Sequence, residues 1–84
     1  MKESNRSCVR KDQNLVALGR EVRRLRDARG LSQEELAERS RLHRNYIGGI
    51  ERGERNVGIR ALFQLARGLA LHPSEVLRGV RLTW

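Results

Sequence analysis

The sequence predicts a single all-α domain, and three observations lead to this fold class. Apolar residues recur at helical spacings of three and four, as in Leu15, Leu18, Val22 and Leu25. Capping and stop residues divide this pattern into short segments, and no stretch alternates apolar and polar residues as a strand does. The length of 84 residues leaves room for one core only. We therefore expect a compact five-helix bundle over residues 14–84.

The first predicted helix runs from Asn14 to about Arg29, where Gly30 offers a left-handed stop. Residues 1–13 carry four basic and two acidic side chains and almost nothing apolar, so we expect a flexible tail there. The basic tail is either an arm that touches DNA or a segment without a role. The run Arg23–Arg26 distributes three arginines around the helix, which favours a solvated face over a DNA contact.

Ser32 and Glu35 mark the start of the second predicted helix. They form the Ser-x-x-Glu capping box, in which each side chain satisfies a free backbone N–H of the first turn. The helix therefore begins at Gln33, and the polar segment after Arg39 ends it. So short a helix needs neighbours to hold it.

The third predicted helix spans Arg44 to Arg52, with Ile47 and Ile50 on its inner face. Its centre holds Gly48 and Gly49, each of which costs about 1 kcal/mol relative to alanine inside a helix. We expect these glycines to allow close approach to another surface, either the wall of a DNA groove or longer neighbouring side chains.

Two further helices complete the expected bundle. Apolar residues return in a helical pattern from Ile59 to about Gly68. A last helix covers Pro73 to Arg78, because proline is favoured at the first helical position, where its missing N–H does no harm. His43 and His72 precede helix starts and are expected to serve as caps or surface residues.

Composition excludes several classes of function. A net charge of +8 favours an anionic partner. The longest apolar run, Leu69–Leu71, is far too short for a membrane span, and the first residues lack the apolar centre of a secretory signal, so we expect a cytoplasmic protein. Cys8 is the only cysteine, and no cluster of metal ligands or catalytic groups occurs, so we expect no metal site, no cofactor and no enzyme.

The segment from Leu31 to Leu69 contains the blocks SQEELA, YIGGIERGERN and LARGL in a fixed order and spacing. It resembles the helix-turn-helix domain of the phage repressors and Cro proteins, the XRE family, and the resemblance extends over about Leu15 to Leu77. Within that family, the small controller proteins of restriction-modification systems are similar in size and in the block RNYIGGIERGERN. The implied fold is the lambda-repressor-like bundle, whose second motif helix enters the major groove of DNA.

The resemblance also implies site residues. The positions that read bases fall on Arg44, Asn45 and Gly49; arginine can bond guanine and asparagine adenine, whereas a glycine reads nothing through a side chain. The positions that face phosphates fall on Gln33, Tyr46, Arg52, Arg55 and Asn56. Glu51, inside this basic block, is expected to form an ion pair with a neighbouring arginine.

Apolar residues near the end of the chain exceed what so small a bundle can cover. They either close the core or form a two-fold dimer interface, which we prefer because operators of this motif are palindromes read by two protomers; the set is Val76, Leu77, Val80, Leu82 and Trp84.

These features together predict a sequence-specific transcriptional regulator that binds a double-stranded DNA operator as a homodimer. Repression would follow from occlusion of RNA polymerase, and activation from a surface placed beside RNA polymerase; the sequence leaves the sign open. An antitoxin-like protein-interaction module with secondary DNA binding is the alternative, and binding without sequence preference is a third hypothesis.

Overall fold

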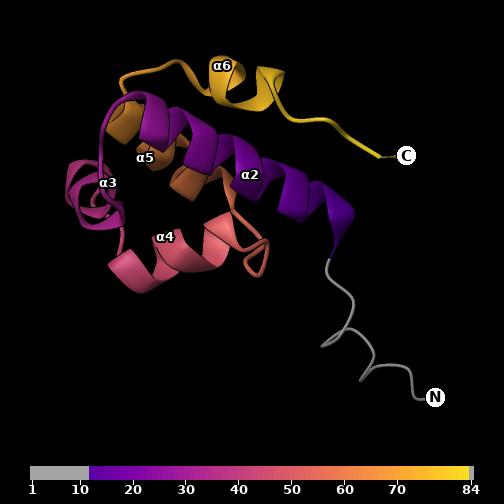
Figure 1. The fold of residues 1–84 in the computed structure, drawn as a ribbon, viewed down its shortest axis with the longest axis horizontal. Helices are drawn as coiled ribbons and strands as arrows, with labels where there is room; N and C mark the ends of the chain where they lie inside the picture. Colours follow the sequence, from indigo (N-terminus) through magenta and orange to yellow (C-terminus); the bar gives the residue numbers. More distant parts are fainter. Residues whose placement is uncertain (1–11, 84) are drawn as a thin grey trace.

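The computed structural model describes residues 12–83, which form five α-helices with no strand among them (Figure 1). The all-α prediction is confirmed, and each expected helix is present. In chain order the helices are α2 (Gln13–Ala28), α3 (Gln33–Ser40), α4 (Arg44–Glu51), α5 (Ile59–Leu69) and α6 (Pro73–Arg78). No helix among these residues is both long enough and apolar enough to cross a bilayer.

Helix α2 begins within the segment that the sequence suggested was a tail. The carboxylate of Asp12 accepts hydrogen bonds from the backbone N–H groups of Asn14 (2.8 Å) and Leu15 (3.3 Å). This cap satisfies donors that have no partner inside the helix, so Gln13 is already helical. The rest of the expected tail, residues 1–11, lies outside the described residues.

Side-chain caps fix three of the other helix starts. The hydroxyl of Ser32 accepts from the N–H of Glu35 (3.0 Å), and the Glu35 carboxylate accepts from the N–H of Ser32 (2.8 Å), so the predicted capping box is confirmed. This contact lowers the pKa of the Glu35 carboxyl. The rings of His43 and His72 cap α4 and α6, each accepting a backbone N–H at 3.1 Å.

Two helices end on left-handed residues that are not glycine. Gly30 after α2 has a φ of +67°, as predicted. Arg41 after α3 (φ 60°) and Ala70 after α5 (φ 59°) adopt the same conformation in spite of their Cβ atoms. Both N–H groups bond carbonyls of the last helical turn, which holds the chain in this conformation.

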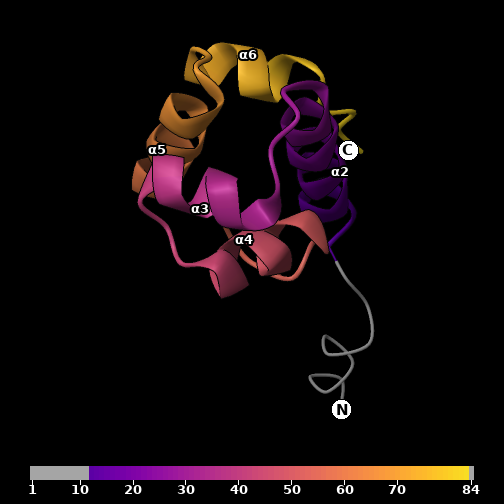
Figure 2. The ribbon, with the colours of Figure 1, turned by 60° about the vertical axis from the view of Figure 1, so that its left-hand side comes forward.

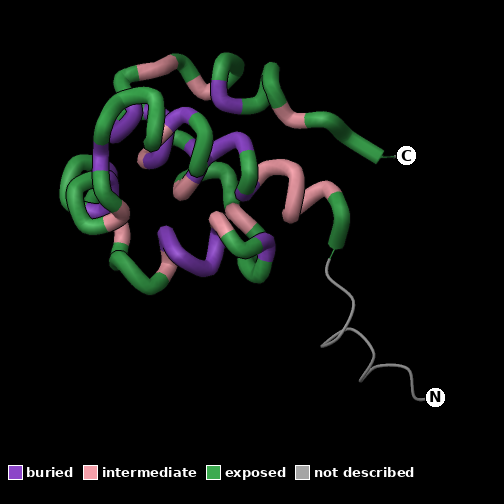
Figure 3. The backbone as a smooth tube through the Cα atoms, in the orientation of Figure 1, coloured by how far each residue is buried: buried purple, intermediate pink, exposed green. Residues whose placement is uncertain are grey.

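The helices close into a ring, in which α4 packs on α2 and α3, α3 packs on α5, and α6 joins α5 to α2 (Figure 2). Buried positions line the inside of the ring (Figure 3). The core is entirely aliphatic and comprises Val22, Leu25, Leu31, Leu36, Ala37, Ile47, Ile50, Leu62, Leu65, Ala66, Leu69 and Val76.

The expectation that Val76 forms part of a dimer interface is wrong. Its side chain is fully buried within the single chain, because α6 turns this residue inward against α5 and α2. Leu77 beside it points outward and is 47% exposed. Trp84 lies outside the described residues.

Candidate nucleic-acid interface

Helices α3 and α4 form a helix-turn-helix unit across a three-residue turn. Arg41 reverses the chain in the left-handed conformation, and the N–H of Leu42 then bonds the carbonyl of Ala37 (3.0 Å). Leu42 packs against the core, so the turn is fixed at both of its ends before His43 starts α4. The two short helices are therefore held in one orientation by the turn and by the packing of α3 on α4.

Helix α4 presents its first turn to solvent and its opposite face to the core. Ile47 and Ile50 are buried, whereas the side chains of Arg44 and Asn45 are exposed. In the free protein Arg44 is not idle, since its Nε lies 3.0 Å from a carboxylate oxygen of Glu34 on α3. Both partners are more than half exposed, so solvent weakens this ion pair.

The glycines of α4 accommodate two arginines from the segment that follows the helix. A Cβ added at Gly49 would lie 2.8 Å from Cγ of Arg55, and one added at Gly48 would lie 3.0 Å from a terminal nitrogen of Arg52. The Arg55 guanidinium also lies 5.6 Å from the centre of the Tyr46 ring, within cation–π range. Of the two expected explanations, longer neighbouring side chains account for these glycines in the free protein.

A close approach of α2 to α4 requires a third glycine, one that sequence reasoning did not single out. A Cβ at Gly19 would collide with the backbone carbonyls of Ile50 and Glu51 at the end of α4. The small-residue position in the middle of α2 was visible in the sequence, but its partner lies some thirty residues further along the chain. Gly19 thus fixes how deeply the last turn of α4 sits against the domain.

A buried ion pair ties the end of α4 to α2. The guanidinium of Arg26 donates two hydrogen bonds to the carboxylate of Glu51 (2.6 and 3.1 Å) and a third to the carbonyl of Leu31 (2.8 Å). The side chains are 11% and 4% exposed, respectively, and the hydrogen bonds with Glu51 raise the pKa of Arg26. The predicted ion pair of Glu51 is confirmed, but the expectation that Arg26 belongs to a solvated face is wrong.

The same carboxylate holds the side chain of Gln33 at the start of α3. The amide nitrogen of Gln33 donates to Glu51 across 3.0 Å, and its oxygen lies close to the position that a Cβ on Gly48 would take. One network therefore joins α2, the first turn of α3 and the last turn of α4. It orients Gln33 beside the N-terminal end of a capped helix, where the helix dipole favours an anion.

The remaining expected phosphate-facing residues lie on the segment after α4. Arg52, Arg55 and Asn56 are exposed, and Arg52 donates to Glu54 at 3.1 Å. Residues 39–60 contain six arginines and two glutamates, which is half of the net charge of +8 in about a quarter of the chain. This region can attract and position a polyanion.

Comparisons with known proteins bear on this arrangement. The helix-turn-helix family HTH_3 matches residues 22–76. The control protein C.SmaI of Serratia marcescens is 54% identical over 52 residues, 62% of this chain and 62% of that protein, so the chain spans less than two thirds of its length. The control protein C.BamHI of Bacillus amyloliquefaciens is 40% identical over 63 residues, 74% of this chain and 78% of that protein.

A solved structure agrees with the fold. The crystal structure of the restriction-modification controller protein C.AhdI from Aeromonas hydrophila superposes with a TM-score of 0.72 at 50% identity. The superposition covers 74% of this chain and 94% of that one. The ring of helices and the helix-turn-helix unit are thus shared with a protein of related sequence.

Proposed function

The chain belongs to the helix-turn-helix family HTH_3 and is a DNA-binding transcriptional regulator rather than an enzyme, and on this premise we propose that it reads a palindromic operator as a homodimer. The supporting observation is the outward first turn of α4, where Arg44 and Asn45 face solvent while Ile47 and Ile50 anchor the helix. Such a helix can enter the major groove without disturbing the core. Half-sites would then lie about 34–36 Å apart.

Arg44 and Asn45 are the proposed base-reading residues. A guanidinium bonds both acceptors of guanine and a carboxamide bonds adenine, each pair contributing about 1–3 kcal/mol of discrimination. Gly49 at the third expected position offers no side chain, and Arg55 lies across it. Reading is therefore concentrated in the first turn of α4.

Phosphate contacts are proposed for the residues around this helix. Gln33 presents a polar side chain from the start of α3, and its orientation by Glu51 supports this role. The other members are Tyr46, Arg52, Arg55 and Asn56. Such contacts position the protein on the duplex and make its affinity depend steeply on salt.

A random-pool selection of duplexes followed by one matched pair of variants tests the proposal. Arg44→Ala should weaken binding to the selected operator by about 1–3 kcal/mol and bring it close to binding of random DNA. Arg67→Ala, which removes an exposed arginine from α5, is the control and should leave the ratio unchanged. An equal loss on operator and random DNA for Arg44→Ala would contradict base reading.

The proposed dimer interface uses the exposed apolar residues after the core position Val76. Leu77 and Leu82 are 47% and 50% exposed, and Val80 is half-buried. Sedimentation at tens of micromolar should show a dimer that Leu77→Glu together with Leu82→Glu converts to monomer. Ser74→Glu adds charge on α6 away from these leucines and should leave the dimer intact. A wild-type monomer at that concentration would refute the interface.

The relatives C.SmaI, C.BamHI and C.AhdI support a role as controller of a restriction-modification system. A neighbouring gene for a methyltransferase or an endonuclease would fit this role. A promoter fused to a reporter decides the sign of regulation: occlusion of RNA polymerase lowers expression, and contact with RNA polymerase beside it raises expression.

A further inference from the structure

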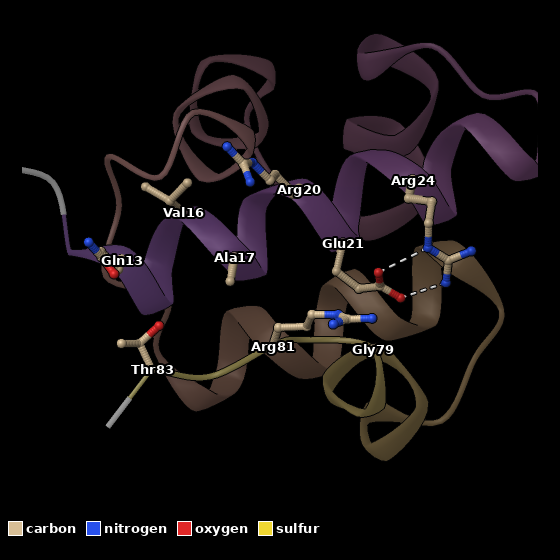
Figure 4. A pocket seen from close by; sticks show the side chains of 9 residues that line it. All are labelled: Gln13, Val16, Ala17, Arg20, Glu21, Arg24, Gly79, Arg81 and Thr83. Atoms are coloured by element: carbon tan, nitrogen blue, oxygen red, sulfur yellow. Dashed lines mark hydrogen bonds and ion pairs between the residues drawn. The ribbon is translucent and has the colours of Figure 1, made fainter.

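A cavity of about 520 Å³ lies between α2 and the segment that follows α6 (Figure 4). One wall is a face of α2 formed by residues at helical spacing between positions 13 and 24. The other wall is the extended segment 79–83, which runs back along this face. Nothing in the helix-turn-helix unit contributes to either wall.

The extended segment is anchored to α2 at both ends. Gly79 lies so close to the carboxylate of Glu21 that a Cβ there would collide with it. The side-chain amide of Asn14 pairs with the backbone of Thr83, accepting from its N–H (2.6 Å) and donating to its carbonyl (3.2 Å). Seven helical residues span about 10 Å, and four extended steps reach about 13 Å, so the segment bridges two turns of α2.

The walls are strongly basic. They carry three arginines and one glutamate, a net charge of +2. Arg24 is engaged with Glu21 through two hydrogen bonds (3.0 and 2.6 Å), which lower the pKa of the Glu21 carboxyl. Arg20 and Arg81, from opposite walls, have no ion-pair partner within residues 12–83, which leaves two cationic groups available at the cavity.

The cavity also has an apolar part. Val16 and Ala17 belong to its α2 wall, one turn before Arg20. The volume falls within the range of about 300–1,000 Å³ that is usual for small-molecule sites and exceeds the need of an inorganic ion. A ligand that fits this cavity therefore carries both an anionic group and an organic portion.

We propose that this cavity binds a small organic phosphate monoester, with Arg20 and Arg81 on the phosphate and the organic portion over Val16 and Ala17. A phosphate monoester carries about −1.5 to −2 charges at pH 7, which matches the surplus of two arginines. Guanidinium groups bind phosphate through paired hydrogen bonds, and Arg20 and Arg81 approach from two sides.

The site is separate from the DNA-binding unit. Helix α4 and the segment after α6 lie on different sides of α2 (Figure 1). The ligand and the operator therefore do not compete for the same arginines. The inference goes beyond the proposed function, and it is tested without DNA.

A titration followed by ¹H–¹⁵N correlation spectra at constant ionic strength tests the proposal with phenyl phosphate as the probe. Saturable shifts are expected at residues 13–24 and 79–83. Phenol and inorganic phosphate are the matched probes, each lacking one half of the recognised group, and both should bind at least tenfold more weakly. Shifts centred on α4, or equal affinity for inorganic phosphate, would overturn the proposal.

Two double variants of equal charge complete the test. Arg20→Gln with Arg81→Gln should weaken phenyl phosphate binding by about tenfold for each arginine removed. Arg23→Gln with Arg67→Gln removes two exposed arginines outside the cavity and should leave the affinity within twofold. All four positions are exposed, so both proteins should fold, which their spectra verify. Equal weakening in both double variants would refute a built site.

Discussion

Replacing Arg26 by methionine is expected to lower the free energy of unfolding by about 3–5 kcal/mol, because the carboxylate of Glu51 would stay charged and buried. Arg26 donates three hydrogen bonds, at 2.6, 3.1 and 2.8 Å, and Glu51 is only 4% exposed. Domains of this size unfold with about 5–15 kcal/mol in total, so the variant would lose a large part of its stability.

Urea unfolding followed by circular dichroism at pH 7 measures this loss. Arg23→Met is the matched control on the exposed side of α2, where the pair with Asp27 spans 3.9 Å. Its effect should stay within about 0.5 kcal/mol. Arg26→Met combined with Glu51→Leu should recover most of the loss, because the apolar pair leaves no buried charge. The reasoning fails if Arg26→Met costs less than about 1 kcal/mol, or if the double variant is no more stable than the single one.

Three further predictions concern single side chains. Arg41→Gly should raise the free energy of unfolding by about 0.5–1 kcal/mol by relieving the left-handed φ of 60°, whereas Arg41→Ala, which keeps a Cβ, should not. Glu34→Gln should release Arg44 and strengthen operator binding about 1.5- to 5-fold in a titration, more than the matched exposed change Glu38→Gln does. Glu21, whose pKa is lowered by Arg24, stabilises the fold above its unfolded pKa, and this contribution is lost as pH falls through the folded value; Glu21→Gln should flatten that acid limb in unfolding measured from pH 7 to 3.

Most of the helix boundaries could be predicted because caps act over a few residues. Ser32 and Glu35 are three positions apart, and the hydrogen bonds that join them depend on little else. Asp12 was overlooked although its cap is equally local, because the charged composition around it suggested a tail. The same composition therefore concealed a boundary that a single carboxylate decides.

The candidate site was predicted in part. The positions of Arg44 and Asn45 on the outer first turn of α4 agree with the helical spacing of Ile47 and Ile50 on its inner face. The roles of the two α4 glycines depended on where Arg52 and Arg55 lie, and that required the course of the following segment. Local periodicity cannot supply this information.

By itself, the sequence determined the fold class, the five helices and the helix-turn-helix unit, because periodicity and capping depend on neighbours within about one helical turn. Only the tertiary structure decided which side chains are buried. Arg26 is enclosed while Arg23 and Arg24 are exposed, and Val76 is enclosed while Leu77 is not. Adjacent residues of one kind differ in this way because burial depends on contacts with distant parts of the chain, such as Glu51 for Arg26, and these exist only once the ring of helices has closed.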